Sequence, residues 1–401
     1  MTEIANKKLK VGNVPNLRFS GFEGEWEEKK LGEMNIINPK NENLPNSFIY
    51  IDLESVVNGR LLKEEMFFKG EAPSRAQRRL VKGDILFQMV RPYQKNNLYF
   101  NKEGDYVAST GYAQIRTLEN SQFVFQYLHN QKFVDKVIER CTGTSYPAIN
   151  SSDLGNIKIH YPNSQEQNKI ASFLKLLDKR IQTQMKIIEN LETLIKKMSE
   201  ELFTQKTRFK KDLIDWEVKK LREICKVYDG THQTPNYVDD GIPFYSVEHL
   251  TANQFDKTKF ISEEVFEKEN KRVILERGDI LMTRIGSIGV AKYINWDVNA
   301  SFYVSLALIK KSRKINNEYL CHFMNSSFFQ SELWKRTIHV AFPQKINLGE
   351  IGDCLIKIPS FTEQTKIANF LSSIDEKIKV EKSLLQQYES QKKYLLANLF
   401  V

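Results

Sequence analysis

The sequence has 401 residues, of which 41% are apolar and 27% charged, and this composition excludes a disordered chain. The longest apolar run, residues 302–309, is too short to cross a membrane, and the first ten residues hold no stretch that could act as a secretory signal. The four cysteines form no C-x-x-C pair and no disulfide framework, so we expect a soluble protein of the reducing cytoplasm. A net charge of +9 favours a polyanionic partner without specifying one.

The first half of the chain begins with a polar segment, residues 1–16, that we expect to form a flexible tail. Residues 17–162 then have the pattern of a mixed α/β domain, because short runs rich in Ile, Phe and Tyr, such as 48–53, indicate strands. Turn signals such as Asn58-Gly59 separate these runs, and residues 121–140 predict a helix. The order of the strands does not follow from this pattern.

A long helix is predicted over residues 163–205. Between Ile170 and Leu202 a seam position recurs at alternating steps of four and three residues, and Gln184 is the polar member of the series. This heptad pattern is typical of helices that pack as a coiled coil. Asn163-Ser164 offers a start for the helix, with Gln167 as the capping-box partner of Ser164.

The second half of the chain follows the same plan. Residues 206–359 again indicate a mixed α/β domain, with a strand predicted over 302–309 and a helix over 317–336. A second long helix is predicted over 360–401, and Ser360 with Glu363 offers it a capping box.

Five sequence blocks occur twice in the same order, with an offset that drifts between about 190 and 197. Chance could produce one such match but not five in register, so we interpret the chain as two copies of one unit of roughly 190 residues. The matched pairs are 26–33 with 216–223, 83–86 with 278–281, 127–128 with 319–320, 146–150 with 342–347, and 166–174 with 363–371.

The two long helices are expected to bury each other, because a lone amphipathic helix of this length would expose its apolar stripe. The polar break in the seam falls at the same place in both copies, at Gln184 and Glu381. If the helices run antiparallel about a pseudo-twofold axis, these two side chains would meet near the axis and fix the register. The alternative is a solvated polar position on each helix.

Motifs of catalytic chemistry are absent from the sequence. It contains no phosphate-binding loop, no Pro-Pro dipeptide of the kind found in adenine methyltransferase sites, no nuclease carboxylate cluster and no histidines at metal-ligand spacing. Residues 286–289 resemble a nucleophile elbow weakly, and a tight turn is the favoured interpretation.

Basic and amide side chains cluster outside the long helices, which are themselves almost balanced in charge. Arginine can bind guanine with two hydrogen bonds, amides can bind adenine, and both contact phosphates, although a solvated basic loop remains the alternative for each residue. The candidate DNA-binding residues are Arg75, Gln77, Arg78, Arg79, Lys82, Arg91, Tyr93, Lys95, Ser145, Tyr146, His232, Arg284, Ser287, His339, Gln344 and Lys345.

Two basic modules joined by paired helices would act as a ruler on DNA. Thirty-eight helical residues span roughly 57 Å at 1.5 Å each, which allows two modules to lie about one turn of duplex apart. Because the modules differ in sequence, the site would consist of two unlike half-sites around an unread gap.

The whole chain from about Leu17 to Phe400 resembles the specificity subunit of a type I restriction–modification enzyme. The resemblance rests on the duplicated layout, the Trp26 and Trp216 openings, the two Gly-Asp-Ile-Leu motifs, and the Glu-Gln-x-Lys-Ile-Ala-x-Phe-Leu start of both helices. It implies an α+β fold of two tandem mixed α/β target-recognition domains, each followed by a long helix, with the helices in an antiparallel coiled coil. The implied organisation is a tail at 1–16, recognition domains at 17–162 and 206–359, and spacer helices at 163–205 and 360–401.

The resemblance further implies a non-catalytic DNA reader that docks two methyltransferase subunits and up to two restriction subunits. S-adenosylmethionine, ATP and Mg²⁺ would serve those partners, and this chain would hold no cofactor or metal. Candidate partner-binding residues on the helices are Gln167, Lys169, Phe173, Gln364, Lys366 and Phe370.

Two other hypotheses stay open at this point. One is a DNA-modifying enzyme, a nuclease or methyltransferase with an unrecognised active site, which would show activity as a purified chain. The other is a coiled-coil adaptor that does not bind DNA, for which binding would lack the steep salt dependence of phosphate contacts.

Overall fold

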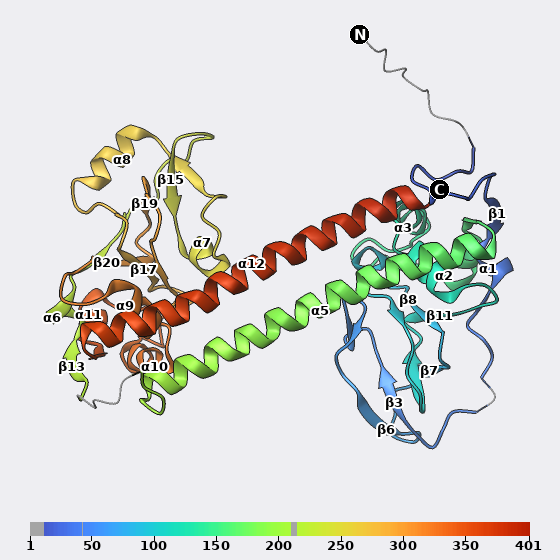
Figure 1. Ribbon diagram of the computed structural model, residues 1–401, viewed down its shortest axis with the longest axis horizontal. Coiled ribbons are helices and arrows are strands. Elements are labelled where there is room, and N and C mark those ends of the chain that lie inside the picture. Colours follow the sequence, from blue (N-terminus) through green and yellow to red (C-terminus); the bar gives the residue numbers. More distant parts are fainter. Residues whose placement is uncertain (1–11, 42, 210–214) are drawn as a thin grey trace, which may run out of the picture. The chain divides into compact units, whose positions relative to one another are not determined.

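The computed structural model describes residues 12–41, 43–209 and 215–401, and Figure 1 shows it. The chain forms two compact units: unit 1 consists of Met1–Lys186 with Ser383–Val401, and unit 2 of Ile187–Lys382. Each unit holds a mixed α/β part and about half of each long helix, α5 (Ser164–Phe203, green) and α12 (Phe361–Leu399, red). Residues 1–11 of the expected tail lie outside the described residues.

Unit 1 contains two four-stranded sheets. The first has the order β2 (Asn35–Ile37), β11 (Tyr112–Thr117), β8 (Ile85–Gln88), β9 (Leu98–Tyr99). The second has the order β6 (Glu65–Phe68), β3 (Ser47–Ile51), β10 (Tyr106–Ser109), β7 (Ala76–Arg79), in which β3 and β10 are parallel. Two short antiparallel pairs complete the strands of this unit: β1 (Glu27–Lys30) with β12 (Lys158–Tyr161), and β4 (Val56–Val57) with β5 (Arg60–Leu61).

The turn between β4 and β5 is the predicted Asn58-Gly59. Both residues have positive φ, at 50° and 71°, as a two-residue hairpin turn requires. The predicted helix at 121–140 is instead two helices, because Asn130 is extended and its side chain accepts from Lys132 N, which starts a new helix. The helices of this part are α1 (Leu31–Met34), the 3₁₀ turn η1 (Pro92–Gln94), α2 (Ser121–Tyr127), α3 (Gln131–Ile138) and α4 (Ser151–Gly155).

Unit 2 repeats this strand plan. Its four-stranded sheet has the order β14 (Val227–Asp229), β20 (Leu306–Ile309), β17 (Ile280–Thr283), β18 (Ala291–Tyr293). Its second sheet has the order β16 (Lys259–Ile261), β15 (Ile242–Tyr245), β19 (Ser301–Phe302), and β15 is parallel to β19 as β3 is to β10. The pair β13 (Glu217–Lys220) with β21 (Leu355–Ile358) matches β1 with β12. The internal repeat in the sequence is therefore a repeat of the fold.

Two elements of unit 2 differ from the predictions. The run 302–309 is not one strand: Leu306 N donates to Tyr303 O, and this turn sends β19 and β20 into different sheets. The predicted helix 317–336 breaks at Ser326, which is extended, at the same place as the break in unit 1. The helices of this part are α6 (Leu221–Ile224), α7 (Val247–Ala252), α8 (Glu263–Asn270), α9 (Asn317–Met324), α10 (Ser327–Arg336) and α11 (Leu348–Asp353).

The core of each unit forms around the tryptophan that opens the repeat. In unit 1, Trp26 and Phe123 are buried with Phe400, which comes from the end of the chain. In unit 2, Trp216 and Tyr319 are buried in one cluster with Phe203. Each core thus joins an α/β part to the C-terminal end of a long helix, α12 in unit 1 and α5 in unit 2.

The long helices pair in an antiparallel sense within unit 1. Lys392 Nζ lies 2.5 Å from a carboxylate oxygen of Asp178, and the Arg180 guanidinium lies 5.3 Å from the Tyr388 ring centre, so residue numbers rise along α5 as they fall along α12. In unit 2, Lys382 pairs with Glu192 at 2.6 Å. Gln184 is buried, as the seam predicts, but its pairing with Glu381 in the other unit stays a prediction.

The starts of the long helices are capped, at α12 by the predicted Ser360 and at α5 by a neighbour of the predicted residue. Asn163, rather than Ser164, is the cap of α5, since its side chain accepts from Glu166 N at 2.9 Å. Ser360 Oγ accepts from Glu363 N at 3.3 Å in α12. Gln167 does not return to the cap, because its amide donates to Pro162 O at 3.0 Å.

Candidate nucleic-acid interface

A short hairpin loop projects from unit 1 beside β8. Residues 142 and 148 close it through paired backbone hydrogen bonds of 2.9 and 3.0 Å, and Gly143, with a φ of +89°, permits the turn. Tyr146 lies on this loop with 64% of its surface exposed. The Arg91 guanidinium stacks over the Tyr146 ring at 4.2 Å, and Arg91 N donates to Pro147 O. An arginine and an aromatic ring therefore form one solvent-facing pair.

Unit 2 carries the matching loop. Ile338 N donates to Lys345 O at 2.8 Å, and Gly286 N donates to Gln344 O, just as Arg91 N does to Pro147 O. Phe342 is fully exposed at 104% and Val340 nearly so at 97%, although both are large apolar side chains. Exposed apolar side chains on a projecting loop are typical of a surface that contacts a partner.

The two loops share geometry but not chemistry. The loop in unit 1 offers Ser145 and Tyr146 with Arg91 behind them, whereas the loop in unit 2 offers His339, Gln344 and Lys345, all exposed. The His339 ring lies 4.8 Å from that of Trp334. The structure thus gathers three predicted residues at each loop: two on the loop of unit 1 with Arg91 beside them, and three on the loop of unit 2. Sequence reasoning missed the exposed side chains Trp334, Val340 and Phe342. The match of Tyr146-Pro147 to Phe342-Pro343 was the sequence signal that could have pointed to this loop.

The predicted arginine cluster at 75–82 lies on and around β7, in the second sheet rather than beside the loop. Arg79 pairs with Asp105 at 3.5 Å and Lys82 with Glu103 at 2.7 Å, both at the surface. Gln77 donates to Ser74 O, and Arg75 is exposed. These side chains lie where solvent and a polyanion could reach them.

Arg78 and Arg91 are the best-placed candidates for binding an acceptor. Among the described residues, the buried Nε atoms of both side chains have no hydrogen-bond partner. Buried donors are normally paired with a protein group or with ordered water, so the described part of the fold does not use either Nε atom. Burial also lowers the pKa of Arg78, although a guanidinium stays charged at neutral pH.

Arg284, in contrast, is used by the fold. Its Nε donates to Val304 O at 2.8 Å and its other amino groups reach Ile346 O and Asp229. The side chain is buried and holds the base of the loop in unit 2, so it does not reach the surface. His232 is exposed but its Nε2 lies 2.6 Å from Asp229, while Ser287 stands exposed in the turn after Arg284.

Tyr93 and Lys95 follow Arg91 in unit 1. Tyr93 is exposed, whereas Lys95 is half-buried and donates to His129 O and to the Gln131 side chain. Burial lowers the pKa of Lys95, with Lys392 and Lys393 adding to the effect. Lys95 therefore belongs to a separate cleft.

Two stretches of the chain, residues 23–193 and 214–390, match the family model of the type I restriction modification DNA specificity domain. The chain belongs to this family. It is 30% identical over 274 residues to the MjaVIII type I restriction enzyme specificity subunit of Methanocaldococcus jannaschii, covering 63% of this chain and 64% of that protein. The alignment therefore spans less than two thirds of the relative's length.

Two solved structures share the fold of this specificity-domain chain. The S subunit of a type I restriction–modification system from M. genitalium aligns with a TM-score of 0.65 and 18% identity, over 97% of this chain and 99% of that one. A chain from a structure described as the basis of complex assembly and conformational transition of the type I R-M system aligns with a TM-score of 0.55 and 20% identity, over 97% of both chains.

The Gly-Asp-Ile-Leu motifs of this specificity-domain chain serve the fold. Asp84 and Asp279 are buried, and each accepts a 2.8 Å hydrogen bond from the backbone N–H three residues earlier. Arg116 neutralises Asp84 through two hydrogen bonds of 2.8 Å, and Lys310 neutralises Asp279 at 2.8 Å. The motif therefore ties a turn to its sheet in both units.

The candidate partner-binding residues divide into two groups. Gln167 and Gln364 are buried, and their amides donate to Pro162 O and Pro359 O, so they connect each helix to its α/β part. Lys169, Phe173 and Lys366 are exposed and Phe370 is partly so. The rings of Phe173 and Phe370 are each contacted by a phenylalanine, Phe19 and Phe209 respectively, from the segment before the tryptophan.

Among the described residues, no helix is long and apolar enough to span a membrane. Within the same part of the chain, no group of three or more His, Cys, Asp or Glu side chains is placed to hold a metal ion.

Proposed function

We propose that this chain is the specificity subunit of a type I restriction–modification complex that acts in the cytoplasm. Residues 17–162 and 206–359 would each read one half of a bipartite, asymmetric DNA site. The helices at 163–205 and 360–401 would serve as the spacer that sets the unread gap. The reader would have no active site of its own.

The observation that carries this proposal is the pair of matched loops. Two copies of one fold hold a hairpin loop at the same position, between the same neighbours, with an exposed aromatic ring before a proline. Their polar side chains differ, so each loop would present its own set of donors and acceptors to a base-pair edge. Unlike loops on a repeated frame suit a site made of two unlike halves.

The partners would be double-stranded DNA, two methyltransferase subunits and up to two restriction subunits. One structure with this fold comes from work on the assembly of a type I R-M system, which supports such partners. S-adenosylmethionine, ATP and Mg²⁺ would be bound by those subunits. Exposed helix residues such as Lys169 and Lys366 would lie toward a docked partner.

The deciding experiment maps the adenines methylated in cells that carry this chain with its methyltransferase partner. We expect one bipartite motif, and replacing residues 142–148 by the loop of a relative should change one half of that motif and leave the other half and the gap unchanged. A change in both halves would contradict separate reading. Methyl transfer or cleavage by the purified chain alone would favour the enzyme hypothesis, and DNA binding without salt dependence would favour the adaptor.

A further inference from the structure

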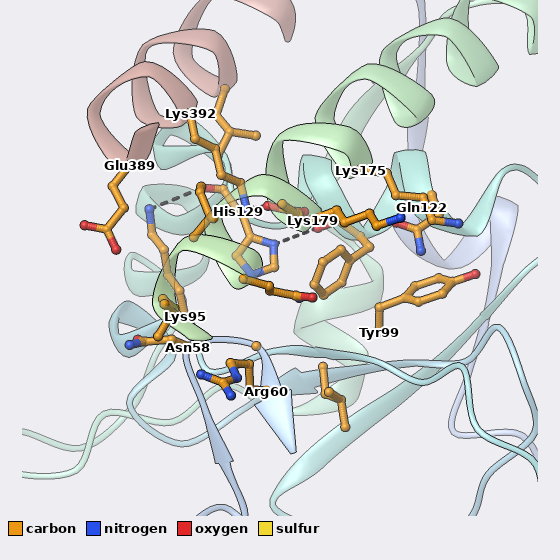
Figure 2. A pocket seen from close by; sticks show the side chains of 18 of the residues that line it. Asn58, Arg60, Lys95, Tyr99, Gln122, His129, Lys175, Lys179, Glu389 and Lys392 are labelled. Carbon is orange, nitrogen blue, oxygen red and sulfur yellow. Dashed lines mark hydrogen bonds and ion pairs between the residues drawn. The ribbon is translucent and has the colours of Figure 1, made fainter. Parts of the chain in front are cut away.

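A wide cleft opens in unit 1 between the α/β part and the two long helices. Its volume is about 1460 Å³, and it is lined by the β4–β5 turn, β9, α2, α5 and α12. Figure 2 shows Lys175 and Lys179 from α5, Lys392 from α12, and Arg60 and Lys95 from the α/β part around the same space. All of these residues belong to one compact unit.

The lining of the cleft is strongly basic. It contains eight Lys or Arg side chains and two carboxylates, and one of those carboxylates, Asp178, is already paired with Lys392 at 2.5 Å. Lys175, Lys179 and Lys393 form no ion pair in the described part of the chain, so their charge is left for a ligand.

The positive charge also acts on a neighbouring histidine, His129. The pKa of His129 falls to about 4, first because the ring is buried and then because Lys392 lies close. Lys95 has its pKa lowered by burial, and Lys393 and Lys392 lower it further. A group of cations that depress one another's protonation is stabilised when an anion enters.

The basic side chains of α5 form one stripe. Lys175, Lys179, Gln182 and Lys186 recur at steps of four, three and four residues, so they share a face of the helix. The stripe is roughly 16 Å long at 1.5 Å per residue, a length that covers about five base-pair steps of 3.4 Å. A linear polyanion fits a row of lysines of this length better than a compact ligand does.

The lysines of the α5 stripe are not repeated at the equivalent positions of α12. The repeat that relates Glu166 to Glu363 places Ser372 and Glu376 where Lys175 and Lys179 stand. Ser372 is also engaged, since it lies between His322 at 2.9 Å and Glu318 at 2.6 Å. A partner that docks on both repeats in the same way would need the same surface in both units. Because α12 does not repeat the basic stripe of α5, the cleft suits a ligand that binds unit 1 alone.

We propose that this cleft binds the sugar–phosphate backbone of duplex DNA beside the half-site that unit 1 reads. The inference rests on the proposed function. It adds a sequence-independent DNA contact, here called the anchor, to one of the two repeated units. Lysines would neutralise phosphates as point charges, and Tyr99 and Gln122, which also line the cleft, would donate to phosphate or sugar oxygens. The anchor contributes affinity and salt dependence but no sequence preference.

The test compares two triple variants of the full chain bound to its methyltransferase partner. The cleft variant is Lys175→Gln, Lys179→Gln, Lys393→Gln. The control variant is Lys196→Gln, Lys377→Gln, Lys379→Gln, which removes the same charge from exposed positions of the same two helices in unit 2. Binding to a 40-base-pair duplex without the recognition site is measured across a salt series, and so is binding to the recognition site itself.

We expect the plot of log K against log salt to be less steep for the cleft variant. Its negative slope should shrink in magnitude by about 2.7, at about 0.9 for each lost phosphate contact. The ratio of specific to unspecific affinity should stay unchanged, and the control variant should keep the wild-type slope. Arginine at the three cleft positions should restore the slope, because a guanidinium keeps the charge. Equal melting temperatures would establish that the variants are folded.

An unchanged slope in the cleft variant would overturn the proposal. Loss of co-elution with the methyltransferase partner, with DNA binding otherwise intact, would overturn it in favour of an acidic protein segment as the occupant. The proposed function has its own failure: the wild-type complex would bind all duplex sequences equally. In that case the difference in slope between the two triple variants would still show whether the cleft binds DNA.

Discussion

Arg18 and Glu166 lie 148 residues apart in the sequence and form a two-point salt bridge, with Arg18 Nε 2.8 Å from one carboxylate oxygen and a terminal amino group 2.7 Å from the other. Arg208 and Glu363 form the same bridge in unit 2, at 3.0 and 2.8 Å. Both carboxylates are buried at the first turn of a long helix. The bridge therefore ties the segment before each tryptophan to the helix that follows the α/β part.

The bridge in unit 2 should be costly to break on one side. Replacing Glu363 with Leu leaves Arg208 buried without its anion and removes the acceptor of Trp216 Nε1, so we expect a loss of about 3 kcal/mol in the free energy of unfolding. Urea denaturation measures this loss. The double variant Arg208→Met, Glu363→Leu should recover much of the stability, and an additive loss in the double variant would contradict the argument.

The loop in unit 2 should contribute to DNA affinity without contributing to stability. Phe342→Ala removes a fully exposed ring, so the melting temperature should stay constant. A ring that stacks on a base or wedges between base steps contributes about 1–3 kcal/mol, so affinity for the recognition duplex should fall about tenfold or more. Leu118→Ala, at another exposed apolar position, is the matched control and should change neither quantity.

Arg78 and Arg284 should respond in opposite ways to replacement by alanine. Arg284→Ala leaves Val304 O and Ile346 O without a donor inside the fold, so we expect destabilisation by about 2 kcal/mol. Arg78→Ala removes a side chain whose Nε has no acceptor among the described residues, so stability should change little while DNA affinity falls. Thermal unfolding and a salt series of binding curves separate the two effects, and a destabilised Arg78→Ala variant would contradict the assignment.

Mild acid should destabilise both units through two partly buried histidines, His129 and His322. The pKa values of His129 and His322 fall to about 4, mainly because burial disfavours the charged ring. The unfolded chain takes up protons below about pH 6.5 whereas the folded chain does so only near 4, so stability is full above 6.5 and declines as the pH falls toward 4. Melting temperatures at pH 7, 6 and 5 should show this decline. The double variant His129→Phe, His322→Phe should show a smaller one, and an equal decline would exclude these histidines as its source.

The spacer role of the helices makes a geometric prediction. Inserting seven residues into both helices, after residues 186 and 382, keeps the heptad seam in phase and adds about 10.5 Å. Sequencing of methylated DNA should then reveal the same two half-sites with a gap about three base pairs longer. An unchanged gap, or altered half-sites, would contradict the ruler.

The duplication, the mixed α/β parts and the long helices could all be predicted, because repeats and heptads are local or periodic signals. The order of strands could not, since β3 pairs in parallel with β10 across more than fifty intervening residues. The breaks at Asn130 and Ser326 interrupt helices that periodicity joins, because both residues have extended backbone angles, and at Asn130 the side chain also caps the next helix.

Predictions of individual site residues were limited by burial. Composition cannot tell Arg284, which holds a loop from inside, from Arg78, whose Nε lacks an acceptor. The paired loops could have been found from the Tyr146-Pro147 and Phe342-Pro343 match, but the full exposure of Phe342 is a property of the folded chain. The basic cleft combines residues from 58 to 397 and has no signature in any one segment.

The core of unit 1 takes Leu396, Leu399 and Phe400 into contact with residues that begin at Trp26. On the ribosome, unit 2 is a continuous stretch and has all its residues once synthesis has passed Lys382, whereas unit 1 waits for the last turns of α12. The part translated first is therefore the part completed last, because the apolar side chains that α12 covers in unit 1 can be buried there only after that helix has been made.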